Sequence, residues 1–266
     1  MIKIFQSLSL AGGKKNIDLI RATNECVLVL DGSTPLVNSE YDASRFTEDF
    51  ADAFFDRVER GESVPNAINS ALSDVFSLFE EEVAESNVDM YPSACLLVAY
   101  VNEGRLNIIN IGDTSALVIM KDKSVINITC GDVSCFDEIV IARAKQIRKE
   151  IGADICDIMN FPEIRRMLID NRRKMNKPDG YRILAFGMTD VVESEIISFD
   201  ARDIERVVLH SDGFDRYADE LSAEGADIKK LYTLLRKEEN ADAKLNVAPR
   251  FKVSDDASAV IFTVEQ

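Results

Sequence analysis

Short runs of valine, isoleucine and leucine recur along this chain, separated by polar turns. Runs of this length and composition predict strands that are buried on both faces. The predicted strands cover residues 1–10, 26–30, 94–101, 105–120, 124–129, 181–186, 191–199, 207–210 and 257–264. The sequence Asn102-Glu103-Gly104 between the third and fourth strands is typical of a hairpin turn.

Four other stretches repeat their apolar residues with helical spacing. The first covers residues 42–59, where Phe46, Phe50 and Phe54 form one stripe and Asp42 is placed to cap the first turn. The second covers residues 63–83. The other two are a highly charged stretch at 137–176 and a surface helix at 223–239.

The order of these elements indicates the fold class. Two strands, a pair of helices, several strands, a helical insert, further strands, a helix and a last strand follow one another, without regular alternation of strand and helix. This order favours an α+β fold in which two sheets lie between layers of helices. No repeat, low-complexity tract or linker divides the sequence, so we expect a single domain over residues 1–266.

Composition narrows the range of partners and compartments. The 266 residues carry a net charge of −16, which argues against nucleic acid or an anionic membrane as a partner. No apolar stretch approaches the roughly 20 residues of a membrane span. The N-terminus lacks the features of a signal peptide, and the five cysteines show no C-x-x-C spacing. These features favour a cytoplasmic protein, and they do not indicate an oligomeric state.

Four acidic segments stand at the ends of apolar runs. They are Asp31-Gly32, Gly112-Asp113-Thr114, Ser211-Asp212-Gly213 and Asp255-Asp256-Ala257-Ser258. Asp-Gly is a common turn pair, so any one of these segments could simply be a turn. A carboxylate at the end of a buried strand is costly unless a cation compensates it, and we find no matching lysine or arginine at these ends. Together the segments therefore predict a metal site.

In this order, the four segments resemble the core motifs of the PP2C-type (PPM) metal-dependent protein serine/threonine phosphatases. Asn16-Ile17-Asp18 stands where that family has an N-E-D segment, and Asn176-Lys177-Pro178-Asp179-Gly180-Tyr181 resembles a segment of some bacterial members. The resemblance implies a four-layer α-β-β-α sandwich of two antiparallel sheets. It also implies the hydrolysis of phosphoserine and phosphothreonine in proteins by a metal-activated water.

The resemblance also implies roles for individual residues. Asp31 would bridge two manganese or magnesium ions, with the carbonyl of Gly32 as a further ligand. Asp212 and Asp255 would complete the site of the first ion, and Asp113 with Asp212 would match a third-metal site of bacterial relatives. Asp31 and Asp212 are the expected catalytic residues. Oxygen ligands of this kind suit both metals.

The N-E-D segment departs from the family pattern. Ile17 replaces a glutamate that serves the second metal, so Asp18 or another nearby acid would have to substitute for it. Of the pair before the last strand, the register favours Asp255 as a ligand. Asp256 is then a solvated turn residue, or it supports or replaces a ligand.

Phosphate binding and proton transfer depart from the pattern as well. An arginine that grips the substrate phosphate in the family falls on Gly13 here, next to Lys14 and Lys15, which are the candidate phosphate-binding residues. A histidine that some members use as a general acid is missing, and we expect the single histidine, His210, to pack within its strand. These departures leave open an alternative, a pseudophosphatase that acts as a regulatory or protein-binding module.

The helical insert would form a flap near the mouth of the active site, where substrate choice is made in the resembled family. Its basic residues between Arg143 and Lys174 indicate either a solvated helical face or a surface that docks an acidic or phosphorylated partner.

Overall fold

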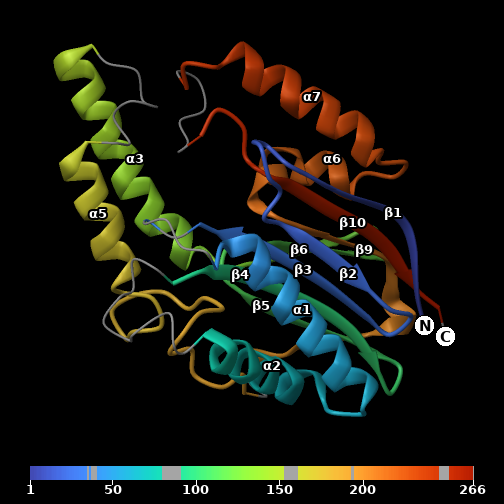
Figure 1. Ribbon diagram of the computed structural model, residues 1–266. Helices are drawn as coiled ribbons and strands as arrows, with labels where there is room; N and C mark the ends of the chain where they lie inside the picture. The colour runs from blue at the N-terminus through green and yellow to red at the C-terminus, as the bar shows by residue number, and fades with distance from the viewer. Residues whose placement is uncertain are drawn as a thin grey trace.

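Two five-stranded antiparallel sheets pack face to face in the computed structural model, with helices over the outer face of each (Figure 1). The structure describes residues 1–34, 36, 41–79, 91–152, 161–192, 195–245 and 252–265. The expected α+β class and the four-layer α-β-β-α arrangement are confirmed.

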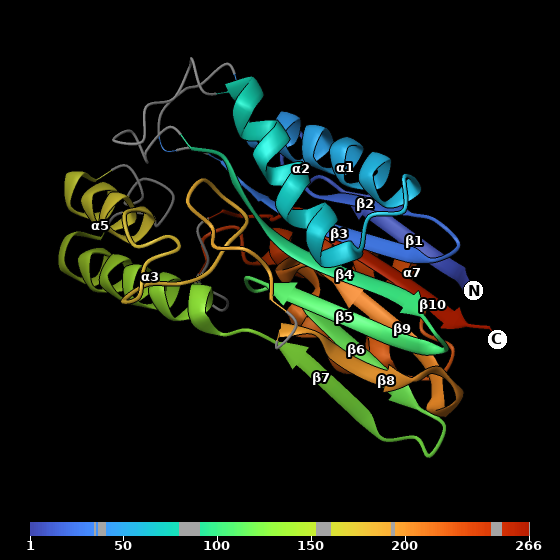
Figure 2. The ribbon, with the colours of Figure 1, turned by 90° about the horizontal axis from the view of Figure 1, so that it is seen from below.

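Each sheet combines strands from distant parts of the chain. The first has the order β1 (Ile2–Leu10), β10 (Ala257–Val264), β9 (Ile204–His210), β6 (Ser115–Met120) and β7 (Val125–Thr129). The second has the order β2 (Leu19–Ala22), β3 (Cys26–Ser33), β4 (Ser93–Asn102), β5 (Arg105–Ile111) and β8 (Ile197–Asp200). The two termini lie together at one end of the sandwich, where β1 and β10 are neighbours (Figure 2).

The helices fall into three groups. Helices α1 (Ala43–Glu59) and α2 (Val64–Phe79) cover the second sheet, and α6 (Ala218–Ser222) and α7 (Ile228–Ala241) cover the first. Helices α3 (Asp132–Ile151) and α5 (Pro162–Arg172), which we call the helical insert, stand beside the sandwich at the end away from the termini (Figures 1 and 2). None of the helices in the described ranges combines the length and the apolar character needed to cross a membrane.

Strand β3 shows why the apolar runs are continuous. Val27 and Val29 face the other sheet, whereas Leu28 and Leu30 face α1 and α2. All four side chains are fully buried. Because alternate residues of a strand point to opposite faces, a strand in the middle of a four-layer sandwich needs apolar residues at every position.

The predicted strand over residues 105–120 is wrong in one respect that matters for the site. It is two strands: β5 ends at Ile111 in the second sheet, and β6 begins at Ser115 in the first. Gly112 makes the crossing with a φ of 101°, and a Cβ on it would lie 2.4 Å from the Sγ atom of Cys95. Only glycine suits both conditions. The crossing leaves Asp113 at the end of the sandwich.

Other predicted boundaries also change. Residues 181–186 form isolated bridges rather than a strand, because they pair only singly, as in Ala94 with Leu184. The strand predicted at 191–199 is reduced to β8, the helix predicted from 223 begins at Ile228, and β2 was not predicted. The first insert helix begins at Asp132, before the predicted start at 137. The end of the second predicted helix, 80–83, lies outside the described residues, as do residues 153–160 of the insert.

Candidate active site

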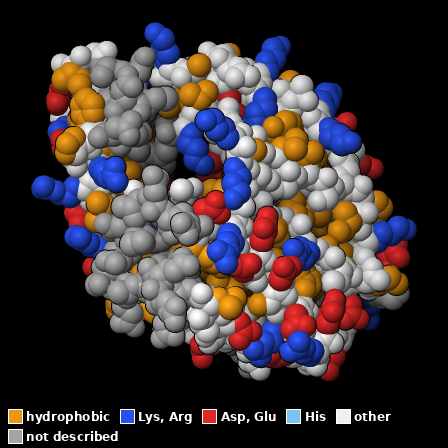
Figure 3. Space-filling view, viewed as in Figure 1, with side chains coloured by type: hydrophobic (Ala, Val, Ile, Leu, Met, Phe, Trp, Pro, Cys, Tyr) orange, Lys and Arg blue, Asp and Glu red, His pale blue; other side chains and the backbone are white. Residues whose placement is uncertain are grey.

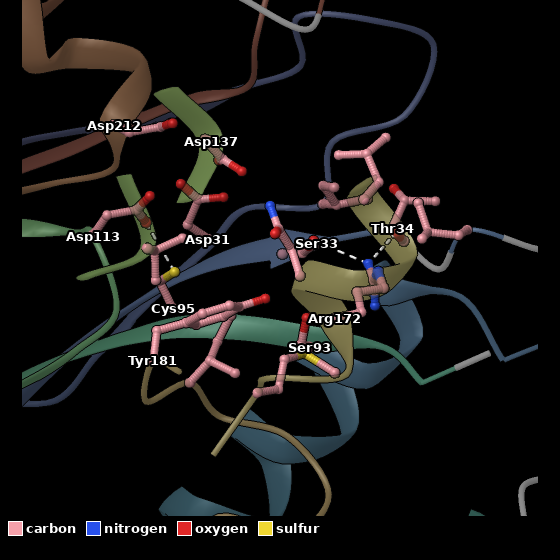
Figure 4. A pocket seen from close by; sticks show the side chains of 18 of the residues that line it. Asp31, Ser33, Thr34, Ser93, Cys95, Asp113, Asp137, Arg172, Tyr181 and Asp212 are labelled. Atoms are coloured by element: carbon pink, nitrogen blue, oxygen red, sulfur yellow. Dashed lines mark hydrogen bonds between the residues drawn. The ribbon is translucent and has the colours of Figure 1, made fainter. Parts of the chain in front are cut away.

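A cleft of about 460 Å³ opens between the end of the sandwich and the helical insert. All four acidic segments reach it: Asp31, Asp113, Asp212 and Asp255 line the cleft, together with Gly32. Figure 4 shows Asp31, Asp113 and Asp212. They come from the end of β3, the β5–β6 crossing, the end of β9 and the start of β10. Segments up to about 220 residues apart in sequence thus meet because their strands end at the same edge.

Cys95 lies beside Asp31 and orients Asp113. Cys95 lies directly opposite Asp31 in the pairing of β3 with β4, and its Sγ atom donates a hydrogen bond to Oδ1 of Asp113 at 2.9 Å. The close approach of Gly112 to this thiol brings the crossing against β4. Cys95 therefore holds Asp113 beside Asp31. This role could not be predicted from the sequence, because the residue lies within an apolar run.

Asp255 has a basic partner that the sequence analysis missed. The Nζ atom of Lys252 lies 2.5 Å from Oδ1 of Asp255, and the carbonyl of Asp255 accepts a hydrogen bond from Nη2 of Arg236 on α7 at 2.6 Å. The expectation that no lysine or arginine matches the acidic strand ends is therefore wrong at this strand. Lys252 precedes Asp255 by three residues in a turn, and apolar periodicity gives no information about where such a side chain points.

Asp18 and Asp256 lie behind the cleft, and their hydrogen bonds hold together the segments that form it. Oδ2 of Asp18 accepts a hydrogen bond from the hydroxyl of Ser211 at 2.8 Å, while its Oδ1 is buried without a hydrogen-bond partner in the described structure. The carboxylate of Asp256 accepts the backbone N–H groups of Gly12 and Ile17, each at 2.8 Å. Asp256 is 5% exposed, so the expectation of a solvated turn residue is wrong.

The carboxylates raise one another's pKa values. Burial is the largest cause of the raised pKa of Asp31, followed by the charges of Asp18, Asp212 and Asp113. Solvent reaches Asp212 through the cleft, yet the surrounding protein and the charge of Asp255 raise its pKa well above 3.8. Burial also raises the pKa of Asp18 to about 7. Buried carboxylates whose charges act on one another in this way favour binding of a divalent cation.

The residues fit such a cation in number and chemistry. Asp31, Asp113, Asp212 and Asp255 offer carboxylate oxygens, and Gly32 offers a carbonyl, which are the donors that magnesium and manganese prefer. As they stand, however, no three His, Cys, Asp or Glu side chains among the described residues are close enough together to hold a metal ion. The side chains would have to turn toward one another to enclose one.

Other candidate residues lie elsewhere. Ile17 lines the cleft as an apolar wall. Lys14 and Lys15 are exposed and do not line it, and Nζ of Lys15 instead contacts Oδ2 of Asp42 at 2.6 Å, at the start of α1. His210 is 1% exposed within β9, as expected, and burial lowers its pKa.

The helical insert adds charged residues that the motifs did not indicate. Asp137 of α3 lines the cleft and points toward the other carboxylates (Figure 4). Its pKa is raised to about 7, chiefly by burial and then by the charges of Asp113 and Asp255. Arg165 and Arg172 of α5 also line the cleft. Acidic and basic side chains are interspersed over the face of the molecule seen in Figure 3.

Arg172 ties the insert to the sandwich. It is 7% exposed, and its Nη1 donates a hydrogen bond to the carbonyl of Tyr91 at 2.8 Å. Its Nη2 donates to the hydroxyl of Ser33 at 3.2 Å and to the carbonyl of Thr34. Ser33 and Thr34 directly follow Asp31 and Gly32, so this arginine fixes the backbone beside the cleft.

Comparisons with known proteins agree with this geometry. A family model described as "Protein phosphatase 2C" matches residues 17–248. Among solved structures, the catalytic domain of the serine threonine protein phosphatase PstP in complex with two manganese ions shares 15% identity at a TM-score of 0.60, with 100% of this chain and 99% of that chain covered. Stp1 from Staphylococcus aureus shares 18% identity at a TM-score of 0.56, with coverage of 100% and 95%.

The serine/threonine phosphatase PstP/Ppp of Mycobacterium tuberculosis shares 16% identity at a TM-score of 0.56, with coverage of 100% and 99%. No curated protein matches the sequence. The solved structures share the fold at low identity, whereas the family model matches most of the chain. This chain therefore belongs to the protein phosphatase 2C family.

Proposed function

We propose that this protein is a metal-dependent phosphatase that hydrolyses phosphoserine and phosphothreonine in proteins. One observation carries the proposal: the carboxylates of four separate strand ends, in a chain of the protein phosphatase 2C family, line one cleft. The alternative of a pseudophosphatase gains no support from the comparisons.

The proposed roles follow from the positions of the side chains. Asp31, the carbonyl of Gly32, Asp212 and Asp255 would hold two divalent cations, and Asp113 with Asp212 would hold a third. Support comes from the exposure of all five to the same cleft and from the raised pKa values of the three carboxylates Asp31, Asp113 and Asp212. When bound, the cations would lower the pKa of water and offset negative charge on the phosphoryl oxygens.

The remaining residues would position these groups. Asp18 and Asp256 support the strand ends from behind through Ser211 and through the backbone of the Gly12–Ile17 segment, and Cys95 orients Asp113. The side chain of Ile17 offers no oxygen, so the second cation would depend on Asp31 and Gly32 for its protein ligands.

The metal is manganese or magnesium, of which manganese is the better first choice for assay, because a relative of the same fold is described with manganese bound. We further propose that the protein works in the cytoplasm on phosphorylated proteins. The described cysteines at 26, 95, 130 and 135 are free, which supports a reducing compartment.

Hydrolysis of p-nitrophenyl phosphate and of a phosphothreonine peptide tests the proposal. We expect activity that requires millimolar manganese or magnesium, is lost in EDTA, and is lost in Asp31→Ala and Asp212→Ala. Asp203→Asn, an exposed acid outside the cleft, is the matched control and should keep full activity. A folded wild-type protein that binds neither metal in calorimetry and hydrolyses neither substrate would refute the proposal.

A further inference from the structure

The cleft has to accept a phosphate dianion, although its described lining carries five aspartates and only three basic side chains. The aspartates are Asp31, Asp113, Asp137, Asp212 and Asp255, and the basic side chains are Arg165, Arg172 and Lys252. Lys14 and Lys15, the candidates from the sequence, lie away from the cleft. A phosphate-binding group should therefore be sought among the three basic residues that line it.

Main-chain carbonyls already bind the two arginines. Nη2 of Arg165 donates to the carbonyl of Leu36 at 2.9 Å. Arg172 is buried and bound to the carbonyls of Tyr91 and Thr34. Moving Arg172 onto a substrate would break its bonds in the protein interior and leave carbonyls unsatisfied, which is costly, whereas the bond of Arg165 to Leu36 is exposed and costs less to break.

Lys252 differs from both arginines. Its Nζ contacts a carboxylate, Oδ1 of Asp255, and its side chain remains 51% exposed. The ammonium is close enough to Asp256 and Asp31 for their charges to act on it as well. A flexible four-carbon side chain that is half exposed can change partners without breaking the fold.

We propose that the ammonium of Lys252 binds the phosphate group of the substrate in this cleft. The inference rests on the proposed function, in which Asp255 becomes a ligand of a divalent cation. A carboxylate that binds a cation attracts the ammonium less. The positive charge of Lys252 beside the cleft is then no longer neutralised by Asp255. A phosphate dianion supplies the missing negative charge, and an ammonium–phosphate contact is a strong, charge-assisted hydrogen bond.

A fixed ion pair is the competing explanation. If Lys252 only neutralises Asp255, its removal changes how tightly the cleft binds manganese and leaves phosphate binding unaltered once the metal is saturating. If Lys252 binds phosphate, its removal weakens phosphate binding even at saturating metal.

The experiment compares Lys252→Ala and Lys252→Arg with wild type. Lys237→Ala, which removes an exposed lysine of α7, is the matched control for loss of one positive charge. For each protein we would measure manganese affinity by calorimetry. At saturating manganese, we would then measure kcat and KM for p-nitrophenyl phosphate and the inhibition constant of inorganic phosphate.

We expect Lys252→Ala to raise both KM and the inhibition constant of phosphate by about tenfold or more. Lys252→Arg should recover most of the loss, since a guanidinium also binds phosphate, and Lys237→Ala should match wild type. An unchanged inhibition constant in an active Lys252→Ala protein would overturn the inference and leave the proposed function intact. A wild-type protein that hydrolyses nothing would instead overturn the proposed function.

Discussion

The two walls of the cleft are built in different ways. The sandwich buries three large clusters of apolar side chains, and its carboxylates stand at the ends of strands that have a neighbouring strand on each side. The helical insert has a small core of its own, made of Val140, Ala144, Ile147 and Ile164. The comparison suggests a division of roles: the sandwich holds the carboxylates in fixed positions, and the insert brings Asp137 and two arginines over them on a less stable support.

The largest expected effect concerns the two cores. Leu97→Ala, between the sheets, should lower the free energy of unfolding by about 3 kcal/mol, because it leaves a cavity in a closely packed interior. Ile164→Ala, in the insert, should lower the free energy of unfolding by less than half as much, and its effect should be confined to the insert. Urea denaturation measures the global effect, and hydrogen exchange of residues 132–172 measures the local one. If both variants lowered the free energy of unfolding equally, and hydrogen exchange in the insert were no faster in Ile164→Ala, the comparison would be contradicted.

A second prediction concerns the charges at the sandwich end. Asp31→Asn should raise the free energy of unfolding of the metal-free protein by about 1–2 kcal/mol at pH 8, because it removes a buried charge that is repelled by Asp18, Asp212 and Asp113. Manganese should stabilise the wild type and not the variant.

Urea denaturation in EDTA and in manganese checks this, with Asp203→Asn as the control. An Asp31→Asn protein that is less stable than wild type in EDTA would mean that repulsion does not dominate the site.

The third prediction is a pH dependence. The pKa of Asp18 is raised from 3.8 to about 7 in the folded protein, so between these values the folded state binds more protons than the unfolded state. The free energy of unfolding of the metal-free protein should therefore fall as the pH rises from 4 to 7, and the stability contributed by the protonated group should be gone above pH 7.

Thermal melts in EDTA across this range measure the slope. Asp18→Asn and Asp137→Asn should each flatten this slope, because burial raises the pKa of both carboxyl groups to about 7 in the folded protein. An unchanged or steeper slope in Asp18→Asn would contradict the prediction.

The smallest effect is expected at the link between the walls. Arg172→Lys keeps the charge but cannot contact Tyr91, Ser33 and Thr34 at once, because lysine lacks the guanidinium fork. We expect the melting temperature to fall by about 2–4 °C, with faster hydrogen exchange in the insert. Arg166→Lys, at an exposed position on the same helix, should change neither quantity. Unaltered exchange in Arg172→Lys would mean that this arginine does not hold the insert.

The same contrast explains what the sequence could predict. The strands of the sandwich were predictable because burial on both faces demands apolar residues at every position, as in β3. The break between β5 and β6 was not, because the apolar run continues on both sides of Gly112. That glycine and Asp113 were recognised as a motif, but the change of sheet depends on contact with Cys95, which is distant in sequence.

Contacts made by polar side chains were the least predictable part of the site. Arg172 reaches Ser33 across 139 residues of sequence, and neither residue belongs to a periodic pattern that would indicate the contact. Lys252 is close to Asp255 in sequence, yet only the structure shows that its ammonium contacts that carboxylate. The four acidic segments were predictable as a group because strand ends collect at the edge of a sheet, whereas single charges on turns have no such constraint.

A crystal structure of the wild-type protein with manganese, using anomalous scattering to locate the ions, tests the central claim most directly. We predict at least two manganese peaks in the cleft, with Asp31 and Asp212 as ligands and with Lys252 no longer paired to Asp255. A cleft without a manganese peak at saturating metal, with the Lys252–Asp255 pair unchanged, would contradict the account.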